Sequence, residues 1–415
     1  MREMKPSSME WIGDIPLSWK VMPNKYLMRK KKEICPVYDG EDILSLTMKG
    51  VIVRDLDAGG KMPASFDGYQ RLEPGNLLMC LFDIDVTPRC IGLIKQAGLS
   101  SPAYSQFVLS DGADAAYYCY YYTMLDNDKT LLHLAKNLRH SLTEDQLGAI
   151  PVIVPPTDEQ RRIADFLDAK CAEIDALTAG IQTQIDTLEQ YKRSVITETV
   201  TKGLNPDAEM KDSGVFYMAP MNASWHLTKI GYICTKLSRS FVPEDTALIC
   251  SNKGKVQVRA DDLTGIMVSD DNAMQGIRAG DIAIHGMDTW HGAIALSEFD
   301  GKITRVVHVC DSTEDKRFIV YYMQHLAFQG VYKLISNGVR GNTSDFRSWD
   351  KVRDIWIAIP KTRQEQKAIC DYLDRQCNAV EEVISTKKQQ LEVLADYKKS
   401  LIFEYVTGKK EVPLS

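Results

Sequence analysis

The sequence predicts an α+β protein of two similar α/β globular domains separated by a long antiparallel two-helix coiled coil, related by a pseudo-two-fold internal repeat. Three observations predict this fold. Residues 159–201 recur at 365–407 with 16 of 43 positions identical and no gap. Both copies carry apolar residues at helical spacing and contain no proline. The residues before each copy form short apolar runs broken by Gly, Pro and Asp, which is typical of strands and turns.

The repeat has an offset of 206 residues, which also carries Ser18-Trp19 onto Ser224-Trp225. Each half is therefore predicted to be a globular domain followed by a long helix. The expected parts are a first globular domain at 1–155, a first spacer helix at 156–204, a second globular domain at 205–360, and a second spacer helix with a C-terminal tail at 361–415.

Within the globular domains, the apolar runs predict strands near 43–48, 50–56, 75–82 and 90–94, and again near 246–251, 255–260, 281–287, 292–299 and 303–310. A helix is predicted at 318–328. The cationic run at 25–33 is interpreted as a solvated helix end.

Each spacer helix is expected to run for about 43 residues, roughly 65 Å at 1.5 Å per residue, and to stop at a glycine after Thr201 or Thr407. An apolar stripe on so long a helix must be buried against a partner helix, and the second copy is the nearest candidate. Gln184 and Gln390 are expected to fix the register. The residues predicted for helix pairing and subunit docking are Leu167, Ile174, Ile181, Gln184, Leu188, Tyr191, Leu373, Val380, Gln390, Leu394 and Tyr397.

Charge and composition restrict the class of protein. The net charge is −6, and residues 1–155 and 206–360 each hold 17 basic and 19 acidic side chains, so neither globular domain is a polycation. A protein that binds DNA alone through its phosphates is usually basic. No apolar run suggests a signal peptide or a membrane span, so a cytoplasmic location without membrane contact is expected. The ten scattered cysteines are expected to be buried thiols without disulfides.

Catalytic patterns are largely missing from the sequence. There is no G-x-x-x-x-G-K-[ST] loop and no F-x-G-x-G with N-P-P-[FY]. Residues 206–211 resemble a nuclease P-D…E-x-K only superficially, and His285, His291 and Cys310 form a weak zinc pattern. The expectation is therefore no catalytic residue and no metal site.

Several phrases resemble the specificity (S) subunits of type I restriction-modification systems. They are W-I-G-D-I-P-x-x-W at 11–19, L-R-H-S-L at 138–142, P-P-T-D-E-Q-R-R-I-A-x-F-L-D at 155–168, and the second copy that ends in Y-K-x-S-L-I-x-E-x-V-T-G at 397–408. The second copy departs from this pattern, with FYMAPMNASW at 216–225 and PKTRQEQ at 360–366. These departures weaken the equivalence of the two halves as docking surfaces.

The resemblance implies that each globular domain is a target recognition domain for one half of a bipartite, asymmetric DNA sequence. The helices would set the gap between the halves and dock two methyltransferase subunits, to which motor and nuclease subunits can be added. No cofactor is implied in this chain, because the partner subunits would use S-adenosylmethionine, ATP and Mg. Different domains on similar spacers agree with two different half-sites.

Base edges and phosphates are contacted mainly by Arg, Lys, Asn, Gln, Ser and Thr. Candidates lie in the turns of both domains and before both helices. For each of them a solvated surface role is about as favoured as DNA contact. The predicted DNA-binding residues are Lys49, Arg54, Lys61, Arg89, Arg139, Lys253, Lys255, Arg259, Trp290 and Arg340.

Two other functions stay open from the residues alone. A non-catalytic coiled-coil scaffold whose globular heads bind proteins would give no sequence-specific DNA footprint. A stand-alone nuclease or methyltransferase would show activity as the purified chain, and the missing motifs count against it.

Overall fold

The computed structural model describes residues 2–57, 63–134, 140–259, 273–336 and 345–413. Its contacts divide the chain into two compact units. Unit 1 comprises Met1–Ile181 with Gln389–Ser415, and unit 2 comprises Gln182–Lys388. Both long helices contribute to both units, so each unit holds one globular part and a portion of each helix.

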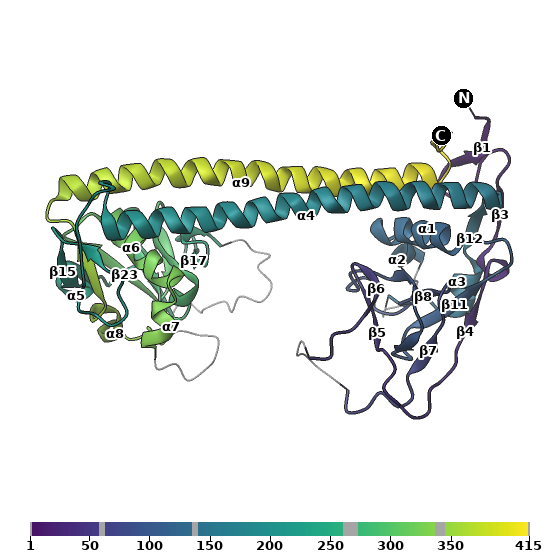
Figure 1. Cartoon of the computed structure of the whole chain (residues 1–415), viewed down its shortest axis with the longest axis horizontal. Helices are drawn as coiled ribbons and strands as arrows, with labels where there is room; N and C mark the ends of the chain where they lie inside the picture. Colours follow the sequence, from purple (N-terminus) through teal and green to yellow (C-terminus); the bar gives the residue numbers. More distant parts are fainter. Residues whose placement is uncertain (1, 58–62, 135–139, 260–272, 337–344, 414–415) are drawn as a thin grey trace. The chain divides into compact units, whose positions relative to one another are not determined.

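In unit 1 the described elements are short strands and a few short helices before the first long helix (Figure 1). The strands are β1 (Met4–Pro6), β2 (Asp14–Pro16), β3 (Lys20–Pro23), β4 (Met28–Lys31), β5 (Leu44–Thr47), β6 (Gly50–Val53), β7 (Gln70–Leu72), β8 (Leu77–Met79), β9 (Ile91–Leu93), β10 (Gly98–Ser100), β11 (Ser105–Leu109) and β12 (Pro151–Val154). The helices are η1 (Asn24–Tyr26), α1 (Ala115–Asn127), α2 (Thr130–Leu134) and α3 (Glu144–Ala149).

The globular part of unit 2 repeats this plan. Its strands are β13 (Met210–Lys211), β14 (Met221–Asn222), β15 (His226–Lys229), β16 (Cys234–Lys236), β17 (Leu248–Ser251), β18 (Lys255–Val258), β19 (Met274–Ile277), β20 (Ile282–His285), β21 (Ile294–Leu296), β22 (Gly301–Thr304), β23 (Val307–Ser312) and β24 (Trp356–Ile359). Its helices are α5 (Ile230–Ile233), η3 (Thr289–His291), α6 (Lys316–Phe328), α7 (Val331–Ile335) and α8 (Trp349–Arg353).

The strand pairings show the repeat directly. Unit 1 has a four-stranded antiparallel sheet in the order β4-β11-β8-β9, and unit 2 has one in the order β16-β23-β20-β21. The pairs β5-β6 and β17-β18 also correspond. The predicted α+β class is confirmed. One expectation is wrong: the cationic run at 25–33 contains strand β4, whose backbone pairs with β11, so its positive charge was a poor guide to secondary structure.

The two long helices are α4 (Thr157–Lys202) and α9 (Arg363–Val406). They are antiparallel within each unit. In unit 1, Lys398 Nζ lies 2.6 Å from Asp175 Oδ1, and in unit 2, Lys387 Nζ lies 2.5 Å from Gln184 Oε1. Glycines follow both helices, as predicted.

These terminal glycines are required by geometry. Gly203 and Gly408 have φ of +88° and +70°, a left-handed conformation that glycine adopts without steric cost. A Cβ on Gly408 would also lie 2.5 Å from Pro16 Cγ. The end of α9 is therefore packed tightly against the globular part of unit 1.

Candidate nucleic-acid interface and its anchors on the long helices

A buried tryptophan fastens each globular part to the start of a long helix. Trp19 Nε1 donates to Glu159 Oε2 at 2.9 Å in unit 1, and Trp225 Nε1 donates to Glu365 Oε1 at 2.9 Å in unit 2. Both indoles are almost completely buried, and Arg2 also pairs with Glu159. The glutamate of the repeated E-Q phrase thus accepts a hydrogen bond from the indole N–H of the repeated tryptophan.

The glutamine of the same phrase holds the first turn of a helix in the globular part. Asp114, the N-cap of α1, donates its backbone N–H to Gln160 Oε1 at 2.8 Å. Asp315, the N-cap of α6, does the same to Gln366 at 2.9 Å. Each glutamine also donates to the carbonyl of a proline just before its long helix, Pro155 or Pro360. Sequence reasoning missed this role, although the repetition of E-Q at offset 206 was the available signal.

Only part of the seam, the row of apolar side chains by which α4 and α9 are predicted to pair, is buried as expected. Leu167, Ile174, Leu373 and Val380 are buried as expected, and Ile181, Leu188 and Leu394 are half-buried. Of the other residues predicted for pairing and docking, Gln184, Tyr191, Gln390 and Tyr397 are exposed rather than buried between the helices, although Gln184 Oε1 accepts from Lys387 Nζ on α9.

A second buried position lies four residues after Leu167, Ile181, Leu373 and Val380. It holds Cys171 and Ile185 in α4 and Cys377 and Ile384 in α9. With 3.6 residues per turn, positions three and four residues away both adjoin the seam, so the stripe alone did not decide between them. Cys171 and Cys377 match at offset 206, a signal that favoured the correct choice.

In unit 1, β5 and β6 form a hairpin with Met48 and Lys49 at its tip. Thr47 pairs with Gly50 across the turn, and the Lys49 N–H donates to Thr47 Oγ1 at 3.1 Å. Gly50 has φ of +92°, the left-handed residue that closes a short hairpin loop. Met48 and Lys49 are exposed, and Met48 retains 61% of its surface.

In unit 2, β17 and β18 form the matching hairpin, with Asn252, Lys253 and Gly254 between the paired Ser251 and Lys255. Gly254 also has a positive φ, of +69°. Asn252 and Lys253 are exposed. The two tips therefore share a Lys-Gly pair that follows a hydroxyl residue and one variable residue.

The candidates Arg54 and Arg259 follow the second strand of each hairpin in the same way. The Arg54 N–H donates to Ile43 O at 2.7 Å, and the Arg259 N–H donates to Ala247 O at 2.8 Å. Four predicted DNA-binding residues thus form two matched pairs, Lys49 with Lys253 and Arg54 with Arg259. Sequence reasoning missed this match because the hairpins are offset by 204 or 205 residues rather than 206.

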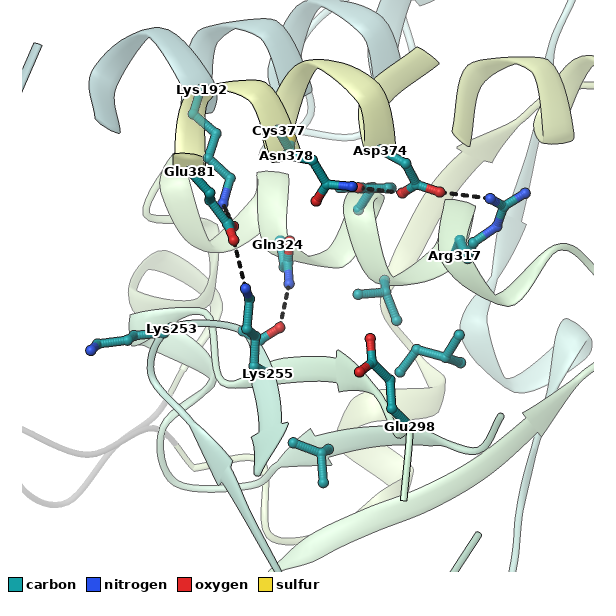
Figure 2. Close-up of a pocket in the computed structure, with 15 residues that line it drawn as sticks. Lys192, Lys253, Lys255, Glu298, Arg317, Gln324, Asp374, Cys377, Asn378 and Glu381 are labelled. Carbon is teal, nitrogen blue, oxygen red and sulfur yellow. Dashed lines mark hydrogen bonds and ion pairs between the residues drawn. The ribbon is translucent and has the colours of Figure 1, made fainter. Parts of the chain in front are cut away.

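A polar cleft of about 430 Å³ separates the second hairpin from the long helices of unit 2 (Figure 2). Glu381 on α9 lies between two cations, at 2.5 Å from Lys192 Nζ on α4 and 2.6 Å from Lys255 Nζ on β18. Gln324 on α6 lies within 3.5 Å of the Gly254 carbonyl. Contacts around this cleft therefore connect the second hairpin, α6 and both long helices.

The charge balance around Glu381 explains its ionisation. Partial burial by itself raises the pKa of this carboxyl, but the hydrogen bonds from Lys192 and Lys255 outweigh burial and hold the pKa below its ordinary value. Glu381 is thus ionised at neutral pH and keeps Lys255 against α9. Figure 2 shows Lys253 directed away from this ion pair.

The remaining DNA-binding candidates divide into three groups. Arg89 pairs with Asp126 at 3.3 Å and with Asn127 at 3.1 Å, so the structure gives it a packing role. Trp290 is half-buried, with Lys333 Nζ 5.8 Å from its ring centroid. The candidates that lie outside the described residues are Lys61, Arg139 and Arg340.

The structure also bears on the metal and thiol expectations. Across the ranges that the structure describes, no three His, Cys, Asp or Glu side chains are placed to hold a metal ion. His285 accepts backbone N–H donors from Met287 and Asp288, His291 is exposed, and Cys310 is buried. All ten cysteines are free, as expected, and nine are buried.

In the described part of the chain, no helix combines the length and apolar character needed to cross a bilayer.

Comparison with known proteins shows what parts of this chain are similar to. Residues 102–187, which include α1 and the first part of α4, match the model of the type I restriction modification DNA specificity domain. A putative type I restriction enzyme MjaX specificity subunit from Methanocaldococcus jannaschii is 22% identical over 293 residues, which are 66% of this chain and 62% of that relative.

A solved structure with a TM-score above 0.5 shares the fold. A chain solved in work on complex assembly and conformational transition of the type I R-M system superposes with a TM-score of 0.67 at 13% identity, over 95% of this chain and 99% of that one. An HsdS subunit from Thermoanaerobacter tengcongensis gives a TM-score of 0.48 at 12% identity, over 98% and 100%.

The fold is thus a repeated globular part with two long helices, and part of the first half matches a specificity-domain model. Residues 102–187 thus resemble the type I restriction modification DNA specificity domain, and the chain spans about 62% of the length of the specificity subunit that it matches.

Proposed function

We propose that the chain reads a bipartite, asymmetric DNA target, one half with each globular part. The observation that carries this proposal is the pair of matched hairpins, which present Lys49 and Lys253 at equivalent, exposed tips. A lysine at the same place in two otherwise different globular parts suits a protein that binds the DNA phosphate backbone at two different sequences.

The long helices support a second part of the proposal, that two copies of a methyltransferase subunit dock on this chain. Exposed apolar or aromatic side chains recur at offset 206. Leu177 and Val383 are 58% and 45% exposed, and Tyr191 and Tyr397 are 50% and 53% exposed. Two equivalent surfaces fit two copies of one partner, and exposed aromatic residues are common anchors at protein interfaces.

In this proposal the chain itself is non-catalytic and holds no cofactor. S-adenosylmethionine would be used by the methyltransferase subunits, and ATP and Mg by motor and nuclease subunits where these join. The near-neutral globular parts agree with such a division, because partner subunits would supply further phosphate contacts.

Sequencing of the host methylome with this gene present and then deleted tests the proposal. We expect one bipartite modified motif to disappear on deletion and to return when the gene is restored with its methyltransferase. A methyltransferase that stays active on the same motif without this chain would contradict the proposal. The alternative scaffold predicts no footprint on DNA from the purified complex.

The proposed spacing role makes a further prediction. Insertion of four helical residues after Gln184 adds about 6 Å to α4, close to two base-pair steps of B-DNA. We expect the gap in the methylated motif to lengthen while both half-sites stay the same. The matched control is the same insertion after Asn205, beyond the end of α4. An active helix variant with an unchanged gap would refute the spacing role.

A further inference from the structure

The two hairpin tips share one feature and differ in another. Lys49-Gly50 and Lys253-Gly254 both begin two residues after the last paired residue of the first strand, and both glycines are in the left-handed region, although Gly50 pairs with Thr47 while Gly254 lies within a three-residue loop. The residue before the lysine is Met48 in unit 1 and Asn252 in unit 2, and both are exposed. The two tips thus share the lysine, which suits a sequence-independent phosphate contact. They differ in the residue directly before it.

We propose that these tips are the reading elements of the two globular parts, an inference that rests on the proposed function and adds the specificity-determining residues. Each hairpin enters the major groove of its half-site, where a two-stranded ribbon fits. Lys49 and Lys253 bind phosphates. Met48 and Asn252 contact base edges.

The chemistry of the variable position sets what each tip can recognise. The Asn252 side-chain amide offers one donor and one acceptor, which match N7 and the N6 amino group of adenine. Met48 offers only an apolar surface, which matches the methyl group of thymine and no hydrogen-bonding edge. The two tips would therefore select different bases, as an asymmetric target requires.

The packing of the second hairpin holds its tip in place, which supports a role in base recognition. The Lys255–Glu381 ion pair ties the strand after the tip to α9, and Gln324 packs under the turn. A Cβ on Gly254 would lie 2.4 Å from Gln324 Nε2, so the turn sits close against α6. Figure 2 shows Lys253 projecting away from these anchors. The base of the tip is fixed while its end stays exposed, which is the arrangement that precise recognition needs.

Reciprocal substitution tests the inference. Met48→Asn and Asn252→Met are each introduced into the full chain, co-expressed with its methyltransferase, and the modified motif is sequenced. We expect Met48→Asn to change only the half-site read by unit 1 and Asn252→Met only that read by unit 2. Loss of an Asn–adenine pair should reduce the preference for adenine at one position by roughly tenfold or more. Each variant is the control for the other.

Lysine variants and thermal unfolding complete the experiment. Lys49→Ala and Lys253→Ala should weaken binding of the complex to target and non-target DNA by the same factor and make its salt dependence shallower. Met48→Asn and Asn252→Met variants that melt like the wild type and keep its motif unchanged would overturn the assignment of the tips, as would a change in the opposite half-site. A wild-type complex with no bipartite motif would instead overturn the proposed function itself.

Discussion

Gln366→Leu is expected to lower the free energy of unfolding of unit 2 by about 3 kcal/mol, because the glutamine is buried and serves several partners. Gln366 is 1% exposed. Its Oε1 accepts from the Asp315 N–H, and its Nε2 donates to Pro360 O and to Glu314 Oε2. Leucine fills a similar volume but leaves the buried backbone groups without partners.

Thermal unfolding followed by circular dichroism measures this effect. For a unit of about this size, a loss of about 3 kcal/mol corresponds to a fall in Tm of roughly 6–12 °C. The matched control is Gln364→Leu, two residues earlier on the same helix and exposed, which should change Tm little. Gln160→Leu should act in the same way on unit 1. Equal melting of Gln366→Leu and Gln364→Leu would contradict the anchoring role.

Acidification between about pH 6.5 and pH 4 is expected to destabilise unit 2 by about 3 kcal/mol through His325 alone. Burial lowers the pKa of His325 from 6.5 to about 4. The ring is 3% exposed, with Nδ1 3.1 Å from Thr197 Oγ1 on α4 and the ring of Tyr322 beside it. No acidic partner compensates a positive charge there among the described contacts of His325.

The sign follows from proton uptake. As the pH falls below 6.5 the unfolded chain binds a proton at this position while the folded chain does not, so folding loses stability until the pH reaches about 4. Above 6.5 the contribution is complete. Burial also lowers the pKa of His285 and His308, which adds to the acid sensitivity of unit 2.

Urea unfolding at a series of pH values checks this expectation. His325→Asn should make the pH dependence of unit 2 clearly shallower, and His291→Asn, at an exposed position, should leave it unchanged. Stability of the wild type that is flat from pH 6.5 to pH 4, or equally steep in His325→Asn, would show that the buried ring is not the cause.

Repetition along the chain and residue periodicity were enough to determine the fold class, the two long helices and their glycine ends, since these depend on local spacing and backbone conformation. They also placed Lys49, Arg54, Lys253 and Arg259 in turns. They did not pair these residues, because hydrogen-bond register between strands decides which tips correspond, and one extra residue in the second loop changes the offset from 204 to 205 residues.

Tertiary structure alone decided which faces of the long helices are buried and which side chains are engaged. The side chains four residues after Leu167, Ile181, Leu373 and Val380 are buried, whereas Tyr191 and Tyr397 are exposed. Arg89 and Lys255 carry the same charge as Lys49, but Asp126 and Glu381 lie beside them. The physical reason is that burial and ion pairing depend on residues distant in the chain. The repeat at 159–201 and 365–407, by contrast, can be recognised by comparing the sequence with itself.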